Sequence, residues 1–174
     1  MESWHGFGGA GNGGFNAVRF CALVLVLLCV NGVAGVGETW PLRDFGPFAL
    51  HAPAGMVLSR NGADSLAGAL ADDKLHIDYD FGLNADPLKT APQGAMDFQV
   101  HSLTLDQLPA RSVTYSKAGS AGQLRFCSGM HVPQVSRSSM GWLRLTLMAC
   151  GADADSMQRS QAIFSTLRFS RLSR

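Results

Sequence analysis

The residue types best suited to chemistry gather in the segment KLHIDYDFG (74–82). His76, Asp78 and Asp80 alternate there with apolar side chains, and this alternation predicts a β-strand. A strand places the three polar side chains on one face, with about 7 Å between successive Cα atoms. Since an imidazole and two carboxylates suit a divalent metal, a small metal-binding protein or hydrolase centred on this face is one hypothesis. The polar side of a half-buried strand is the simpler interpretation, and we favour it because spacing along one strand is loose for direct ligation.

Two cysteines, Cys127 and Cys150, lie in segments that also alternate, QLRFC (123–127) and LRLTLMAC (143–150). In each segment the cysteine falls on the face opposite the leucines. An antiparallel hairpin with Cys127 opposite Cys150 has its tip near residues 136–140, in the polar sequence SRSSM. Because two cysteines in an exported domain usually form a disulfide, we predict a Cys127–Cys150 bridge.

A free Cys127 acting as a nucleophile with His131, in the sequence CSGMH, is the alternative. A catalytic cysteine needs a lowered pKa and a positioned base, and the sequence indicates neither. The GxSxG motif of α/β-hydrolases is absent, and the histidines do not have the HExxH spacing of zinc proteases. We therefore assign no catalytic residue, expect no cofactor, and favour a binding protein over an enzyme.

The chain is 47% hydrophobic and only 16% charged, below the roughly 25% charge of typical soluble domains. The excess lies in the run FCALVLVLLCV (20–30), which follows an arginine and precedes small residues. These are the three parts of a secretory signal peptide, and the run is shorter than the about 20 residues that span a bilayer. We predict a signal peptide over 1–35, cleaved after Ala34 or Gly35, and a periplasmic or secreted protein with no stable transmembrane anchor. An uncleaved anchor is the alternative.

The charge balance bears on the partner. With 14 Lys and Arg against 13 Asp and Glu, the net charge of +1 lacks the basic excess of a nucleic-acid binder. Residues 36–174 have the length of one domain. The leading hypothesis is a non-enzymatic binding module of the cell envelope, which contacts an envelope protein or other envelope component through its sheet edge or surface.

The elements that position these residues are mostly short strands. The segment 65–73 fits either a short helix or a strand followed by a turn, and a phase slip near Ser102 suggests a bulge. Residues 151–169 indicate a helix leading to a short strand, with Asp155 as its N-cap and Gln158 three residues later. The pattern predicts an α+β fold, a single domain in which an antiparallel sheet has a C-terminal helix packed on one face. The remaining predicted strands are 48–53, 55–60, 96–105 and 110–116.

Three segments, 64–88, 103–115 and 162–169, resemble a group of uncharacterised bacterial exported proteins with a Mog1/PsbP-like architecture. The resemblance implies an antiparallel sheet flanked by helices and carries over no catalytic residues. The residues 80–82 match the aspartate–aromatic–glycine strand ending of that group. Gln107 stands where the group has a hairpin glycine, which leaves the tight turn there open.

Overall fold

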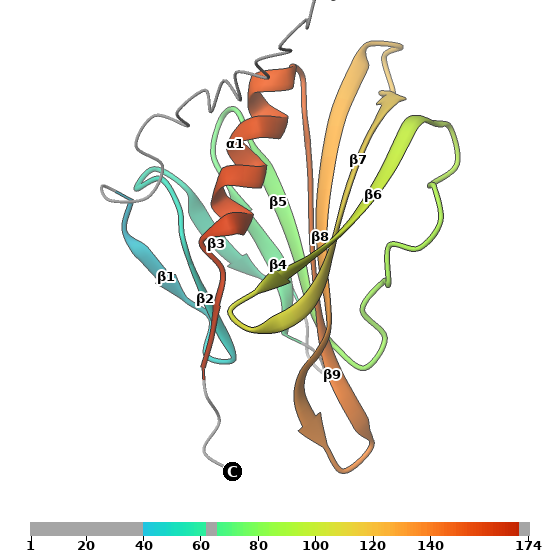
Figure 1. Cartoon of the computed structure of the whole chain (residues 1–174). Coiled ribbons are helices and arrows are strands. Elements are labelled where there is room, and N and C mark those ends of the chain that lie inside the picture. Colours follow the sequence, from blue (N-terminus) through green and yellow to red (C-terminus); the bar gives the residue numbers. More distant parts are fainter. Residues whose placement is uncertain (1–39, 62–65, 171–174) are drawn as a thin grey trace, which may run out of the picture. The chain divides into compact units, whose positions relative to one another are not determined.

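The computed structural model describes residues 40–61 and 66–170, and the predicted signal peptide over 1–35 and its cleavage site lie outside them. Two antiparallel sheets make up most of this part (Figure 1): a large one in the order β3-β4-β5-β9-β8-β7-β6 and a small one in the order β1-β2-β10. Within the described residues, no helix is long and apolar enough to cross a membrane. The elements are β1 (Leu42–Asp44), β2 (Phe48–His51), β3 (Val57–Arg60), β4 (Leu66–Ala71), β5 (His76–Gly82), β6 (Ala95–Leu105), β7 (Leu108–Ala118), β8 (Leu124–Ser138), β9 (Gly141–Gly151), α1 (Ala154–Ser165) and β10 (Arg168–Phe169).

The predicted antiparallel sheet with a C-terminal helix on one face is confirmed. The helix α1 packs on β8 and β9, and the small sheet lies beside it on the same side of the large sheet (Figure 1). Because strands far outweigh the single helix of the described chain, the label α+β fits only loosely. Strands at the positions of β2 and β10 were predicted, but the small sheet that they form with β1 was not, because β1 has only three residues and is too short to show alternation.

The main core lies between the large sheet and the layer formed by α1 and the small sheet. The alternation predicted for β5 is confirmed, because Ile77, Tyr79 and Phe81 are buried there. From the other layer, Phe48 of β2 and Phe164 of α1 pack against the same cluster and are fully buried. Complete burial of a side chain of this size stabilises the fold by about 1.5–3 kcal/mol.

A second, smaller core covers the opposite face of the sheet. Leu88, in the loop that joins β5 to β6, packs there with Val113, Tyr115 and Cys127. This loop can approach the sheet because Gly129 has no side chain; a Cβ atom at Gly129 would lie 2.8 Å from Leu88 Cδ1. The centre of β8 is therefore buried on both faces, and its backbone hydrogen bonds with β7 and β9 are shielded from water.

The predicted hairpin of β8 and β9 is confirmed, and Cys127 lies directly opposite Cys150 in the ladder. A disulfide joins the two cysteines, whose Cα atoms are 4.1 Å apart. Both cysteines belong to the second core, on the face opposite the leucines of β9, as the alternation predicted.

The β8–β9 ladder is interrupted once, between Val132 and Ser136. Only Arg144 of β9 stands opposite the intervening segment 133–135, which forms an extended bulge. Pro133 begins this segment, and its lack of an N–H suits a position where no ladder hydrogen bond is made.

Two hairpins separate at this point. The pairing of β7 with β8 ends at Arg111 opposite His131. Beyond it, the tip of the β6–β7 hairpin curves toward β10 while the tip of the β8–β9 hairpin runs on in its own direction (Figure 1). The divergence forms a fork whose two prongs are the hairpin tips.

The prediction for the bulge in β6 was wrong in position. The ladder with β7 is continuous from Gln99 to Leu105, so Ser102 is regularly paired, and the irregularity lies between Met96 and Gln99. There, Asp97 has a φ of 53°. Because β6 is an outer strand that is largely exposed on both faces, its apolar residues do not show which side chains face the core or where the alternation shifts.

The turn between β6 and β7 is tight, although Gln107 stands where the resembling group has a glycine. Asp106 and Gln107 both adopt positive φ, 46° and 70°, as a two-residue hairpin turn of the I′ kind requires. The Asp106 carboxylate accepts a hydrogen bond of 2.8 Å from the Phe169 backbone N–H, which ties this turn to β10. Asparagine or glycine is preferred at such positions, but this tertiary contact helps to hold the turn without them.

The prediction of the helix N-cap was also wrong. Asp153 rather than Asp155 is the cap, because Asp153 has extended backbone angles and its side chain accepts a 2.7 Å hydrogen bond from the Ser156 N–H. Asp155 lies in the first turn of α1. Of the two alternatives for 65–73, the strand is correct and forms β4.

Removing the disulfide should destabilise the fold without changing it. Loss of a link between residues 23 apart in sequence costs about 3 kcal/mol on the chain-entropy estimate. We expect the Cys127→Ala/Cys150→Ala double variant to unfold at lower urea than the oxidised protein, with an unchanged far-UV circular dichroism spectrum. Reductant should weaken the wild-type protein and leave the double variant unaffected; equal urea midpoints for the two oxidised proteins would contradict the assignment.

Candidate functional site

A pocket of about 530 Å³ lies in the fork between the two hairpins. Its walls come from the β5–β6 loop and from β6, β7, β8 and β9, so five parts of the chain contribute to it. We call it the fork pocket and define it by the lining residues Lys89, Arg111, His131, Trp142 and Arg144. The bulge in β8 forms part of the wall, since it bends this hairpin away from its neighbour.

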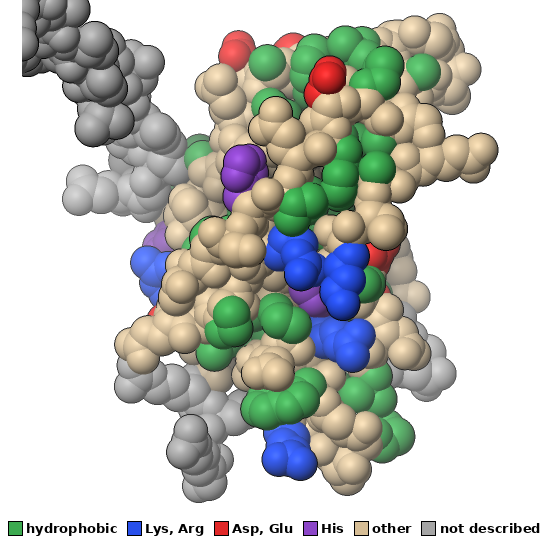
Figure 2. All heavy atoms as spheres, turned by 45° about the vertical axis from the view of Figure 1, so that its right-hand side comes forward, with side chains coloured by type: hydrophobic (Ala, Val, Ile, Leu, Met, Phe, Trp, Pro, Cys, Tyr) green, Lys and Arg blue, Asp and Glu red, His purple; other side chains and the backbone are tan. Residues whose placement is uncertain are grey.

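The charge of the fork pocket is one-sided. Its lining holds three cations, Lys89, Arg111 and Arg144, and no Asp or Glu. Figure 2 shows Lys and Arg side chains gathered around a histidine on this face of the molecule. Three cations from a loop and two different strands converge although the whole chain has a net charge of only +1. The pocket therefore concentrates positive potential that the composition does not reveal.

His131 is the buried member of the lining, with 2% of its surface exposed. Its Nδ1 lies 2.9 Å from Thr146 Oγ1, and Thr146 Oγ1 donates its own hydrogen to the Asp86 carbonyl at 2.7 Å. Because a hydroxyl has one hydrogen, Thr146 must accept from His131, so Nδ1 carries the proton. This network fixes the tautomer and leaves Nε2 of the neutral ring as a hydrogen-bond acceptor.

The surroundings keep this ring neutral. Burial lowers the pKa of His131 from its ordinary value to about 4, and the positive charges of Arg111, Arg144 and Lys89 act in the same direction. Asp86 acts in the opposite sense and is outweighed. At neutral pH the fork pocket therefore presents one acceptor among three cationic donors.

The loop that carries Lys89 is anchored to two strands of the large sheet, β7 and β9. Arg111 of β7 donates from Nη1 to the Pro87 carbonyl at 2.7 Å, and Thr146 of β9 donates to the Asp86 carbonyl at 2.7 Å. Within the loop, the Asp86 carboxylate accepts from the Leu88 N–H at 2.8 Å. Leu88 itself is buried. An arginine has five N–H donors, so Arg111 can hold the loop and still offer donors to a ligand.

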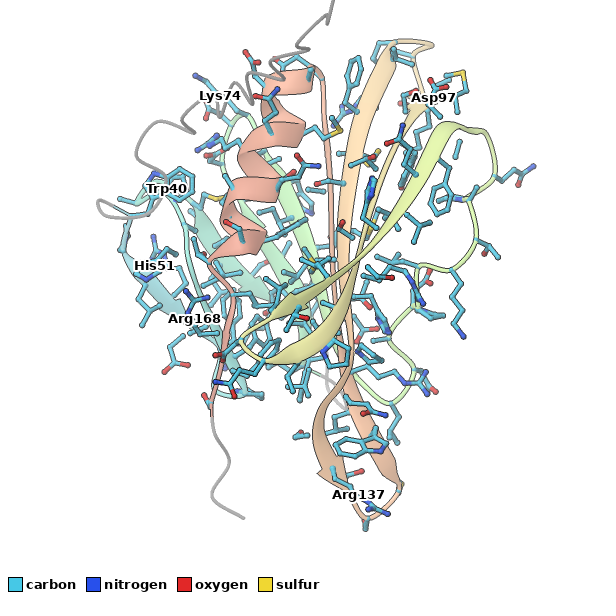
Figure 3. All side chains as sticks on the ribbon, viewed as in Figure 1. Trp40, His51, Lys74, Asp97, Arg137 and Arg168 are labelled. Carbon is cyan, nitrogen blue, oxygen red and sulfur yellow. A yellow bond between two sulfur atoms is a disulfide. The ribbon has the colours of Figure 1, made fainter. Side chains whose placement is uncertain are left out.

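The rim of the fork pocket carries an aromatic ring. Trp142 is 42% exposed. The Arg137 guanidinium lies 5.9 Å from the centre of the ring, within the range of a cation–π contact. Figure 3 shows Arg137 at the tip of the β8–β9 hairpin, beyond the bulge.

The residues of the predicted metal site are only partly brought together. His76 Nε2 and Asp78 Oδ1 are 3.0 Å apart on the exposed surface of β5, and Asp80 lies further along the same face. No group of three metal-ligating side chains occurs within residues 40–61 and 66–170. A shallow depression of about 370 Å³ at the His76–Asp78 pair is also lined by Lys117 and Arg125.

The hypothesis of a free nucleophilic Cys127 is wrong, because Cys127 is bonded to Cys150. His131 directs Nδ1 to Thr146 instead.

Sequence reasoning did not find the cations of the fork pocket. The predicted register of β8 and β9 would have placed His131 opposite Thr146 and Arg144 two residues further on the same strand face, which was a usable signal. Arg111 and Lys89 gave no comparable signal, since they join the site only through the β7–β8 register and the anchored loop.

The buried His131 should make stability depend on pH. An unfolded histidine gains a proton below about pH 6.5, whereas the folded chain resists protonation until about pH 4, so the free energy of unfolding should fall between these values as pH falls. The full loss is about 3 kcal/mol. Urea unfolding from pH 7.5 to 4 measures it. The His131→Gln variant, which does not titrate, should lose this part of the dependence; an unchanged profile in that variant would refute it.

Divalent metals should not stabilise the His76 face. Two exposed ligands beside Lys117 and Arg125 make a weak and electrostatically unfavourable cation site. We expect thermal unfolding of the metal-free protein to be unchanged by zinc, calcium or manganese at concentrations equimolar to the protein. A rise in Tm that the His76→Ala variant abolishes would instead support the metal-binding hypothesis.

Comparison with known proteins adds little to this description. No known protein family and no curated protein matches the chain. A solved structure from Bacteroides thetaiotaomicron is similar over 75% of this chain and 47% of that chain, with 9% identity and a TM-score of 0.36. The chain thus spans about half the length of that protein, and a similarity this low supports no argument about fold or function. The resemblance to exported Mog1/PsbP-like proteins stays a prediction.

Proposed function

We propose that this protein is an exported, non-enzymatic binding module of the cell envelope, and that the fork pocket holds an anionic group of its ligand. The observation that carries the proposal is the convergence of Lys89, Arg111 and Arg144 in a lining with no acidic side chain. Arg111 and Arg144 are half-buried, and Lys89 is exposed. Half-buried cations that lack a counter-ion are costly, and an anionic ligand would supply that charge.

The proposed location agrees with the disulfide. Cys127 and Cys150 form a covalent link that persists in oxidising compartments and is rare in the cytosol. The periplasm or the extracellular space is such a compartment, and the apolar run predicted as a signal peptide would direct the chain there.

The proposal of binding rather than catalysis is supported by the chemistry of the lining. No thiol or carboxylate lines the fork pocket, and its one hydroxyl is that of Ser102 on β6. A general base works best with a pKa near the working pH, whereas the pKa of His131 is about 4. His131 also directs Nδ1 to Thr146, not to Ser102.

The fork pocket is a better binding surface than the sheet edges. The outer strand β3 is only four residues long, and the outer strand β6 has an irregular ladder near Asp97. Short and bulged edge strands are features that discourage the addition of another strand. We therefore assign recognition to the face of the sheet.

Inorganic phosphate is a suitable probe of the anion site. In a two-dimensional NMR titration of isotope-labelled protein, we expect saturable shifts at the amides of His131, Arg144 and the β5–β6 loop. A charge-assisted hydrogen bond is worth about 1.5–3 kcal/mol, so the Arg144→Gln variant should bind phosphate about 10- to 100-fold more weakly.

The control is Arg60→Gln, which makes the same charge change on β3, at the far side of the large sheet. It should bind phosphate as the wild type does. Shifts spread over all surface cations, or equal weakening in both variants, would show that phosphate meets only the general charge of the surface and would refute the proposal.

A further inference from the structure

We infer that the fork pocket selects hydroxylated anions and that its ligand is an acidic saccharide, a sugar bearing a carboxylate or a phosphate. This inference rests on the proposed function, because it specifies what accompanies the anionic group. Three features of the pocket carry it: the acceptor nitrogen of His131, the neutral polar groups of the wall and the exposed ring of Trp142.

The first feature is the mixed polarity at His131. Lysine and arginine only donate hydrogen bonds, so the three cations alone would suit any anion. Nε2 of His131, however, accepts, because the Nδ1 proton is held by Thr146 and Asp86. A bare carboxylate has no hydrogen to give it and would leave a desolvated acceptor unpaired. A ligand with a hydroxyl next to its acidic group satisfies both the cations and the acceptor.

The second feature is the neutral part of the wall. Gln134, in the bulge of β8, and Ser102, on β6, both line the fork pocket. An amide and a hydroxyl can each donate and accept, which is the pairing that several sugar hydroxyls require. The volume of about 530 Å³ lies within the range of small-molecule sites. It exceeds what an isolated phosphate occupies and leaves room for a sugar ring.

The third feature is the aromatic rim. Trp142 has 42% of its surface exposed beside the pocket, and Arg137 lies 5.9 Å from the ring centre. A pyranose has an apolar face of C–H groups that packs on an aromatic ring, while its hydroxyl groups point outward to polar partners. Trp142 can thus hold the sugar ring while the cations hold its acidic group.

The test compares matched pairs of small ligands by isothermal titration calorimetry on the oxidised protein. Glucuronate and cyclohexanecarboxylate have the same charge and the same ring size, but only the first carries hydroxyl groups. We expect glucuronate to bind at least tenfold more tightly. Glucose 6-phosphate against methyl phosphate, which has no hydroxyl group as a dianion at pH 8, forms the second pair, and the tighter of the two sugars identifies carboxylate or phosphate as the acidic group.

Two variants separate the features. Trp142→Ala removes an exposed ring and should weaken glucuronate binding several-fold while leaving the affinity for inorganic phosphate unchanged. His131→Phe replaces the acceptor with an apolar ring and should reduce the preference for glucuronate over cyclohexanecarboxylate. Because His131 is buried, its variant is compared only if the circular dichroism spectrum is native; the ligand pairs and Trp142→Ala are sufficient without it.

Each outcome decides something. Equal affinities within both pairs overturn the selection of hydroxylated anions and leave the anion site standing. Absence of binding by all four anions and by inorganic phosphate overturns the proposed function as well. Glucose binding as tightly as glucuronate shows that the acidic group is not recognised and also overturns the inference.

Discussion

The pairing of β8 with β9 is the interaction on which both the core and the fork pocket depend. At one end, the Cys127–Cys150 bond fixes the register covalently. The residues that follow in this register alternate between the two cores, so that Val132 and Leu145 meet the helix while His131 and Thr146 meet the anchored loop. A slip of one residue would exchange these faces and bury polar groups among the aromatic rings. The register thus determines the fold and the site together.

Within this framework, the chemistry of the site follows from one shared hydroxyl. Thr146 joins the loop carbonyl of Asp86 to the ring of His131, and in doing so it determines which nitrogen of the ring carries the proton. Two strand arginines and a loop lysine then surround a neutral acceptor. Because the loop is anchored through Pro87 and Asp86, its lysine belongs to the same unit as the strands. Polarity, charge and loop position are therefore coupled.

The sequence determines some of these features more clearly than others. Regular alternation revealed β5, because this strand buries one face in the core and leaves much of the other exposed. It revealed the cysteine hairpin because the leucines and the cysteines lie on opposite faces of these strands. In β6, alternation gave the wrong position for the bulge. This outer strand is largely exposed on both faces, so its sequence pattern does not show which face is buried. The predicted N-cap, Asp155, was two residues from the observed one, Asp153. Both aspartates suit this role by residue type, and only the extended backbone angles of Asp153 identify it as the cap. The fork pocket was not predicted because Arg111 and Lys89 join it through the β7–β8 pairing and a loop contact, neither of which has a local signature in the sequence.

The bulge at 133–135 divides the β8–β9 hairpin into two parts that can evolve separately. Substitutions or length changes in the tip beyond it, where Arg137 and Trp142 lie, need not disturb the ladder from Cys127 to Val132. The part that specifies the fold is thereby insulated from part of the rim of the fork pocket. Under the proposed function, changes in the hairpin tip would alter the ligand preference of the fork pocket with little cost in stability.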